Sequence, residues 1–308
     1  MRFSFDDDQL AFRDAVRDLL AKECTPDVVR AAWESDTLDR GVWAALAEMG
    51  VLGMLVPEEH GGMGLDEKWL VLLLEEAGYA GLPHPIVETA AVAMPVIADR
   101  VPADAMITTD LGGPLVPCAA DADFVLLGTQ LVSGATVEPA ESVDRGRRVG
   151  RVTGAGDDLD IDGALAFDRG AWGTAAFLIG LGQRMLDITV GYVSEREQFG
   201  VPVGSFQAVK HHLADAALQL AFARPAVERA AWSLATNDEH RSRDVSMAKA
   251  MASDAAELVG RKALQCHGAI GYTEEADLHL FLKRTWALTR TWGDAEWHRD
   301  RIGRALGI

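Results

Sequence analysis

The C-terminal half of the chain repeats apolar side chains at steps of three and four residues, and this periodicity constrains the fold most strongly. The stripes comprise Phe177, Leu181, Met185, Ile188 and Tyr192; Phe206, Val209, Leu213, Ala217 and Leu220; Met247, Met251, Ala255 and Leu258; and Leu278, Phe281, Leu282 and Trp286. Helices joined by short connections pack as antiparallel neighbours. The pattern therefore predicts an antiparallel four-helix bundle, which we assign to residues 167–308.

The first third of the chain is also helical in character. Apolar residues recur between charged ones, and the pattern predicts helices near residues 10–20, 43–50, 67–79 and 86–100. Gly50 is the expected C-cap of the second of these helices. Glycines and a proline between Pro57 and Gly64 indicate irregular backbone. We assign residues 1–104 to an N-terminal α-helical unit.

The middle of the chain changes to short runs typical of β-strands. These runs lie at residues 124–127, 130–132, 136–137 and 148–152, and glycines and aspartates separate them. We assign residues 105–166 to a small β domain. The expected fold is thus mostly α with a small β domain between two helical units.

Charge and cysteine content exclude several classes of protein. A net charge of −18 disfavours binding to nucleic acids or anionic membranes, both of which require clustered Lys and Arg. Cys24, Cys118 and Cys266 lie far apart and match no zinc-site spacing, so we expect no disulfide framework and no bound metal. The N-terminus lacks the apolar core of a signal peptide, and no apolar run approaches the ~20 residues of a membrane span. These features predict a cytoplasmic protein.

The segment Arg196-Glu197-Gln198-Phe199-Gly200 could bind a ligand. An arginine at this position can hold a phosphate group through two hydrogen bonds, and Gly200 allows the chain to turn. The structural alternative is an arginine that interacts with the dipole at a helix C-terminus. The pentapeptide alone leaves both interpretations open.

A second segment, from Gln265 to Tyr272, is rich in glycine. Its glycines permit a close approach of the backbone to a ligand, and the Gln265 amide can donate and accept hydrogen bonds. A simple turn between helices explains the glycines equally well. Cys266 and His267 are adjacent on a helix and point in different directions, so we do not expect a nucleophilic pair.

Two further segments carry polar residues. Gly293 and Asp294 are typical of a turn that opens a final helix, with Asp294 as the N-cap. His212 and Asp215 could form a hydrogen bond on one helix face, but a metal site would need further ligands there.

The order and spacing of these segments resemble the acyl-CoA dehydrogenase family. The resemblance is carried by Leu181-Gly182-Gln183-Arg184, Arg196-Glu197-Gln198-Phe199-Gly200, Phe206-Gln207 and Gln265-Cys266-His267-Gly268-Ala269-Ile270-Gly271-Tyr272. In the first third, Leu46-Ala47-Glu48-Met49-Gly50 followed by Leu55 to Leu65 is similar to the family's N-terminal domain. The resemblance covers most of the chain and is weakest between residues 103 and 166.

The resemblance implies FAD as cofactor and oxidation of the Cα–Cβ bond of an acyl-CoA. In the family, a carboxylate removes the α-proton while FAD accepts the β-hydride, and FAD lies at subunit interfaces. It implies that Arg196 contacts the FAD diphosphate across the dimer and that Phe199 packs on the adenosine. The other implied cofactor contacts are Gln207, Gln265, Cys266, His267, Gly268 and Ala269.

The chain departs from the family where the catalytic base is expected. Family members commonly carry Tyr-Glu-Gly-Thr before the final helix, and the matching residues here are Thr291 to Asp294. Trp292 takes the glutamate position, and an indole cannot accept a proton. The second position used in the family matches Gly170, although Asp168 is nearby. The middle domain is also short, and Val137-Glu138-Pro139-Ala140 matches its flavin-contacting loop poorly.

These departures predict a non-catalytic subunit of a heteromeric FAD-dependent acyl-CoA dehydrogenase. Such a chain resembles the glutamate-lacking subunits of actinobacterial steroid side-chain enzymes. The implied partners are a glutamate-bearing subunit in an α2β2 heterotetramer, a bulky steroid acyl-CoA and electron-transfer flavoprotein. Two alternatives remain: a self-sufficient dehydrogenase with a relocated base (Asp168, Asp294 or Glu296), and a non-enzymatic scaffold or acyl-CoA binder.

Overall fold

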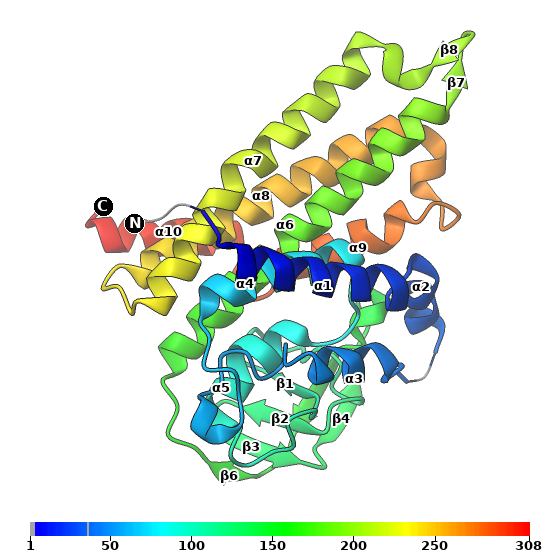
Figure 1. The fold of residues 1–308 in the computed structure, drawn as a ribbon. Helices are drawn as coiled ribbons and strands as arrows, with labels where there is room; N and C mark the ends of the chain where they lie inside the picture. Colours follow the sequence, from blue (N-terminus) through cyan, green and yellow to red (C-terminus); the bar gives the residue numbers. More distant parts are fainter. Residues whose placement is uncertain (1–3, 36) are drawn as a thin grey trace.

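The computed structural model describes residues 4–35 and 37–308. Met1–Phe3, at the start of the expected N-terminal unit, and Asp36 lie outside the described residues. Three long helices run side by side, and most of the short strands gather beyond one end of them (Figure 1). The architecture is mostly helical with a small β portion, as the sequence predicts.

The N-terminal portion contains four α-helices and a short 3-10 helix. Their bounds are α1 Asp7–Glu23, α2 Pro26–Glu34, α3 Gly41–Glu48, η1 Glu58–His60 and α4 Glu67–Ala80. Asp6 and Gln9 form a reciprocal capping box at the start of α1. Pro26 opens α2, a position where its missing N–H costs nothing. Gly50 follows α3 with a φ of +80°, as expected of a residue at the end of a helix.

The helix expected over residues 86–100 is irregular. Residues Val87–Ala93 form the π-helix η2, and Met94–Ile97 form the short helix α5. Pro95 has no N–H to donate to the carbonyl four residues earlier, which disfavours regular α-helical hydrogen bonding here. η2 packs against α6 and β1. π-Helical turns are often found at functional sites.

The β portion consists of a four-stranded sheet and a separate hairpin. The sheet has the order β1-β2-β3-β6, and β4 pairs with β5 in the hairpin. The bounds are β1 Ile107–Thr109, β2 Phe124–Leu127, β3 Gln130–Ser133, β4 Thr136–Pro139, β5 Gly150–Thr153 and β6 Asp157–Asp158. β1 runs parallel to β2, whereas the β2–β3, β3–β6 and β4–β5 pairs are antiparallel. Sequence analysis identified β2 to β5 but not β1 or β6, which are very short.

The C-terminal portion is built on α6 Gly163–Glu195, α7 Gln207–Ala235 and α8 Arg241–His267. The fourth expected helix is the shorter α9, Leu278–Leu288, which packs across α6 and α8, and α10, Ala295–Leu306, packs on α8. Between α6 and α7 lies a small hairpin made of β7 Glu197–Gln198 and β8 Val201–Pro202. The 3-10 helices η3 Arg145–Arg147, η4 Val203–Ser205 and η5 Gly268–Tyr272 complete the chain.

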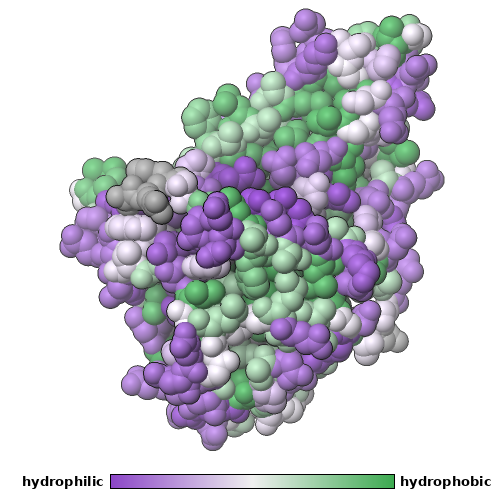
Figure 2. Space-filling model, viewed as in Figure 1, coloured by the Kyte–Doolittle hydropathy of each residue, from purple (hydrophilic) through white to green (hydrophobic). Residues whose placement is uncertain are grey.

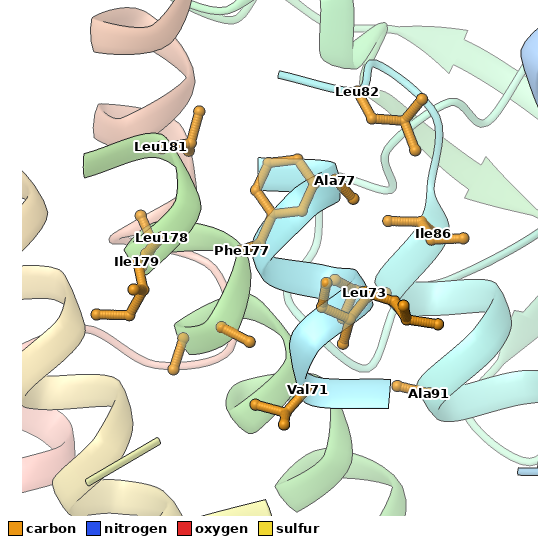
Figure 3. Packing of buried hydrophobic residues seen from close by; sticks show 14 of the residues in the cluster. Val71, Leu73, Ala77, Leu82, Ile86, Ala91, Phe177, Leu178, Ile179 and Leu181 are labelled. Atoms are coloured by element: carbon orange, nitrogen blue, oxygen red, sulfur yellow. The ribbon is translucent and has the colours of Figure 1, made fainter. Parts of the chain in front are cut away.

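A continuous apolar core joins the N-terminal helices to the bundle. Phe177 on α6 lies beside Ala77 on α4 (Figure 3), and Leu178 and Leu181 on α6 and Leu73 on α4 belong to the same core. The two helices cross with their backbones in contact, because a Cβ at Gly180 would lie 1.9 Å from the carbonyl oxygen of residue 75. Small residues at the crossing therefore fix α6 against α4.

No helix in the described parts of the chain has the length and apolar character needed to cross a membrane. Cys24, Cys118 and Cys266 are buried free thiols.

Candidate functional site

Trp292 is completely buried in the turn between α9 and α10. Its indole lies in a slot between two glycines: a Cβ at Gly112 or Gly170 would approach within 2.7 Å or 2.5 Å of ring atoms. Phe167 packs edge-on against the ring, with centroids 5.8 Å apart. The position to which the family resemblance assigns the base is therefore filled by an apolar ring.

Hydrogen bonds from three directions hold the turn that carries Trp292. Its φ of +60° lies in the left-handed region, where a non-glycine residue is strained. The Trp292 amide donates to the Gly112 carbonyl at 2.9 Å, and His298 Nε2 donates to the Trp292 carbonyl at 2.8 Å. Lys249 Nζ donates to the Gly293 carbonyl at 3.1 Å. These contacts stabilise the strained conformation.

Lys249 is itself completely buried. Its ammonium group also donates to the carbonyls of Leu288 and Thr289, each at 3.3 Å, and to Ser253 Oγ at 3.2 Å. Burial lowers the pKa of Lys249 to about 7, and the charge of Asp294 opposes this effect. This lysine thus donates to carbonyl groups at the end of α9, a place where helical carbonyls lack intrahelical partners.

The carboxylates considered as relocated bases have other partners. Asp168 is completely buried, but Arg301 Nη1 lies 2.7 Å from its Oδ1 and Ser242 Oγ donates to its Oδ2 at 2.6 Å. Asp168 and Gly170 are two residues apart on α6, so their side chains point in different directions. Asp294 caps α10 by accepting from the Trp297 amide at 2.9 Å, and Glu296 is exposed.

Sequence analysis missed a buried carboxyl group beside Trp292. Glu88, on η2, is 7% exposed, and burial raises its pKa, an effect that the charge of Arg147 opposes. The Trp292 indole N–H also lowers this pKa, but it is a weak partner because it makes no hydrogen bond of normal geometry. A lone glutamate within the apolar run of residues 86–94 was the available signal.

The expected cofactor-binding residues lie at the opposite end of the bundle. Arg196 caps α6 and Gln207 begins α7, with Phe199 at the tip of the β7–β8 hairpin between them. Phe199 is 94% exposed, and its φ of +55° followed by +80° at Gly200 forms the left-handed two-residue turn of a tight hairpin. Arg196 and Gln207 are also exposed.

The Gln265–Ala269 segment meets the same end of the bundle. The ring of His267 stacks on that of Tyr192, with centroids 4.5 Å apart, one helical turn before Arg196. Gln265, Gly268 and Ala269 are exposed.

The side chains of Cys266 and His267 are instead buried in the bundle. Burial raises the pKa of the Cys266 thiol, and His267 Nδ1 lies 2.8 Å from the Ala263 carbonyl oxygen. These two residues can reach a surface ligand only through their backbone, and no thiolate nucleophile is favoured.

Two further expectations concern segments of uncertain role. Val137 to Pro139 lies in strand β4, which pairs with β5, and is not a loop. His212 Nδ1 lies 2.9 Å from Lys262 Nζ, an arrangement that places a cation where a metal would bind. Among the described residues, no group of three or more His, Cys, Asp or Glu side chains could hold a metal ion.

Comparisons with known proteins identify the family. Residues 6–99 match the model of the acyl-CoA dehydrogenase N-terminal domain, and residues 164–307 match that of the acyl-CoA dehydrogenase C-terminal domain. Acyl-CoA dehydrogenase IpdE2 of Mycolicibacterium smegmatis is 34% identical over 290 residues, which cover 88% of this chain and 90% of that protein.

Solved structures show the same architecture. A structure of the Tcur3481–Tcur3483 steroid ACAD superposes with a TM-score of 0.88 at 25% identity and covers 98% of both chains. The ChsE4–ChsE5 complex of Mycobacterium tuberculosis shares the fold with a TM-score of 0.87 at 24% identity, covering 100% of this chain and 99% of that one. The chain belongs to the acyl-CoA dehydrogenase family.

Proposed function

We propose that this chain is the non-catalytic subunit of a heteromeric acyl-CoA dehydrogenase and completes the FAD site of a glutamate-bearing partner. The buried indole of Trp292 carries this proposal. A general base must lie within hydrogen-bond reach of the proton that it removes. An indole has no lone pair for that proton, and the nearby Asp168 is held in an ion pair by Arg301.

Arg196 and Trp292, which belong to the two ends of the implied FAD and acyl site, lie far apart on this chain. The 26 residues from Gly170 to Arg196 span about 39 Å at a helical rise of about 1.5 Å per residue. This separation exceeds the length of an extended FAD molecule. Arg196 and Trp292 therefore cannot serve the same cofactor, and the exposed hairpin is available to a flavin held mainly by another subunit.

FAD is the cofactor of the family, and its adenosine diphosphate half fits the residues at the hairpin. When bound, FAD accepts the hydride from the acyl group. The Arg196 guanidinium suits the diphosphate, because its planar donors pair with phosphate oxygens. The exposed ring of Phe199 offers a face for the adenine, and the amides of Gln207 and Gln265 can donate to and accept from polar groups.

The flavin-ring half of a site is poorly supported in this chain. The segment between the two matched domain models contains the short strands β1 to β6 and the 3-10 helix η3. The only resemblance to a flavin-contacting loop, Val137 to Pro139, lies in a paired strand. This asymmetry favours one FAD for each pair of unlike chains over one FAD for each chain.

A partner subunit agrees with the surface of the bundle. Leu218 and Phe222 on α7 are 52% and 61% exposed. Figure 2 shows apolar surface over this helix. Exposed apolar side chains grouped on one helix face are typical of protein interfaces. We propose an α2β2 heterotetramer, with electron-transfer flavoprotein as the electron acceptor.

The substrate class is proposed from the relatives alone. One similar structure is described as a steroid ACAD made of two differently named proteins, and the ChsE4–ChsE5 complex also pairs two named proteins. We propose that the substrate is a bulky acyl-CoA, such as a steroid side-chain thioester. A complex with one active site for each pair of chains leaves more room for such a group.

Co-expression with a glutamate-bearing family member tests the proposal. The purified complex should contain one FAD per two chains and oxidise acyl-CoA with an artificial electron acceptor, whereas this chain alone should show no turnover. Arg196→Ala in the complex should release flavin. Arg151→Ala is the matched control, because Arg151 is an exposed residue on strand β5. This variant complex should retain flavin. One FAD per chain with turnover by this chain alone would refute the proposal.

A further inference from the structure

A cavity lies where α1 and α4 end beside the start of α2 and the middle of α6. Its volume is about 140 Å³, which is room for about four or five water molecules at about 30 Å³ each. The charged groups in its lining are Arg17, Glu76 and Arg184. The 12 residues from Arg184 to Arg196 span about 18 Å at a helical rise of about 1.5 Å per residue. The cavity is therefore separate from the β7–β8 hairpin.

The half-buried Arg184 guanidinium faces this cavity without an acceptor. It lies over the rings of Tyr79 and Phe281, with its central carbon 5.2 Å and 5.5 Å from their centroids. These contacts use the faces of the guanidinium, whereas its N–H donors point outward from its edges. Its Nε is buried without a hydrogen-bond partner, and no hydrogen bond or ion pair joins Arg184 to another residue in the described parts of the chain. Buried charged groups are normally paired, so Arg184 lacks the anion that its position calls for.

The other ionisable groups in the lining do not supply that anion. Arg17 donates two hydrogen bonds to Glu76, from Nε at 3.0 Å and from Nη2 at 2.6 Å, so the Glu76 carboxylate already has its cation. Burial raises the pKa of the Cys24 thiol to about 12, and this thiol is therefore uncharged near neutral pH. The charge of Arg184 is thus left uncompensated in the cavity, in a chain whose net charge is −18.

A second free donor lies at the start of α2. Thr25 is the N-cap residue of this helix and lines the cavity, but its side chain makes no capping hydrogen bond. Its hydroxyl is therefore available to a ligand, and the partial positive charge at a helix start also favours an anion. Hydroxyl and guanidinium groups on one cavity are typical donors to phosphate oxygens.

The end of α4 offers a different reason for a cation at this place. A helix C-terminus attracts positive charge, and Ala80, the last residue of α4, lines the cavity. Carbonyl groups there have other donors, however. The Ala80 carbonyl accepts from Cys24 Sγ at 3.9 Å, and the Ala77 carbonyl accepts from the Leu82 amide at 3.0 Å. The helix dipole explains why Arg184 is tolerated but leaves its N–H donors unused.

A larger cleft of about 600 Å³ adjoins the cavity and limits the charge of a ligand. The two share Arg17, Glu76 and Tyr79. Glu75 and Glu228 also line the cleft, where carboxyl groups outnumber guanidinium groups. A second anionic group that extended from the cavity into the cleft would be repelled by these carboxylates. The arrangement therefore favours one phosphate group over a diphosphate.

We propose that this cavity binds a single phosphate group, as free phosphate or as a small phosphate monoester, with Arg184 as its main ligand and Thr25 as a second donor. Arg184 holds two phosphate oxygens through the edge of its planar guanidinium. The rings of Tyr79 and Phe281 fix the plane of that group. The site is formed by this chain alone, so it does not depend on the proposed function.

Phosphate binding to the purified full-length chain tests the proposal. Titration calorimetry with sodium phosphate at pH 7.5 and constant ionic strength should give saturable binding. Arg184→Met should weaken it by about tenfold or more, because charge-assisted hydrogen bonds are the strong ones. Thr25→Val, which removes only the hydroxyl, should weaken it to a smaller extent. Arg196→Met removes an exposed arginine from the same helix end and is the matched control, which should bind phosphate as the wild type does. Loss of binding in Arg196→Met but not in Arg184→Met would assign the phosphate to the hairpin and overturn the proposal.

Thermal unfolding separates specific binding from general salt effects. Phosphate stabilises many proteins because it is excluded from their surface, so the Tm of each variant is compared in phosphate and in chloride at equal ionic strength. The extra rise in phosphate should disappear in Arg184→Met and shrink in Arg184→Lys, which keeps the charge but lacks the planar donors. An equal rise in wild type and Arg184→Met would overturn the proposal. If Arg184→Met does not fold, Arg184→Lys and Thr25→Val carry the same test.

Competition identifies the source of the phosphate group. Glycerol 2-phosphate that binds more tightly than inorganic phosphate would assign a monoester, whereas weaker binding would assign free phosphate, and both results support the site. Inorganic diphosphate should bind more weakly than phosphate, because its second anionic group meets the carboxylates of the cleft. Tighter binding of diphosphate would overturn the assignment of a single phosphate group.

Discussion

Restoring a carboxyl group at position 292 should not restore a second active site. In the Trp292→Glu variant, the new side chain would enter a slot built for an indole that is completely buried. Replacing a buried tryptophan by a much smaller side chain costs about 3–5 kcal/mol. At about 2–4 °C per kcal/mol for domains of moderate size, the Tm of the complex should fall by roughly 10 °C.

The charge of the new carboxylate adds a pH-dependent penalty. It would lie beside Glu88, whose own pKa burial already raises. Burial and like charges both raise a carboxyl pKa. When the folded-state pKa exceeds the unfolded-state value, stability is retained below the unfolded pKa and lost as the pH rises through the folded pKa. A difference of one unit between the folded-state and unfolded-state pKa corresponds to about 1.4 kcal/mol of stability. The Trp292→Glu complex should therefore be less stable at pH 8 than at pH 5.

Trp292→Gln separates the effect of volume from that of charge. It is close to glutamate in shape but does not titrate, so its Tm deficit relative to wild type should be the same at pH 5 and pH 8. Scanning calorimetry of the three complexes at both pH values gives these deficits. Turnover per complex, measured with an artificial acceptor, should not rise in Trp292→Glu. A doubling of turnover accompanied by a second FAD would refute our account of the site, and equal deficits for both variants at pH 8 would refute the electrostatic argument.

Two further predictions concern the surroundings of Trp292. Wild-type stability should rise between pH 7 and pH 10, because Lys249 binds a proton in the unfolded chain but not in the folded one, where its pKa is lowered to about 7. Lys249→Met should abolish this rise. Denaturant unfolding across this pH range measures the effect, and an unchanged rise in the variant would contradict the prediction. Arg147→Met should destabilise the chain by leaving Glu88 without its cation, and adding Glu88→Gln should recover part of the loss. The coupling energy from this double-mutant cycle should be about 0.5–3 kcal/mol, whereas strict additivity would show that the two charges act independently.

Local sequence pattern predicted most of the framework. The stripes from Phe177 to Leu258 predicted long helices because an amphipathic helix repeats its buried face every 3.6 residues. The Asp294 N-cap was also confirmed, whereas the C-cap of α3 is Met49, and Gly50 follows it with a positive φ. Strand β1 was missed because it has only three residues, all buried, and therefore no alternating pattern.

The buried charges of Glu88 and Arg147 beside Trp292 could not be predicted, because only packing brings these residues together. Glu88 and Arg147 are far apart in the sequence, and neither belongs to a recognisable motif. The π-helical form of η2, which carries Glu88, also departs from the regular helix that the residue pattern suggested. The segment Arg196–Gly200, by contrast, was identified as a candidate cofactor-binding segment through the resemblance, because its residues are contiguous, although its hairpin form was not predicted. Contiguous recognition motifs survive in the sequence, whereas a site assembled from distant segments does not.

The turn that carries Trp292 and the β7–β8 hairpin bear on whether the proposed subunit is specialised or is an enzyme that has only lost its base. Loss of a catalytic residue without further adaptation would leave an empty acyl cavity, yet Gly112 and Gly170 make room for the indole and Lys249 fixes its turn. The end that carries the hairpin shows the reverse: the Phe199 side chain is 94% exposed, and its ring contacts the Phe206 ring edge-on, with centroids 6.4 Å apart. The buried turn at Trp292 and the exposed hairpin thus agree with the role that we propose, in which this chain supplies cofactor contacts to a neighbouring subunit.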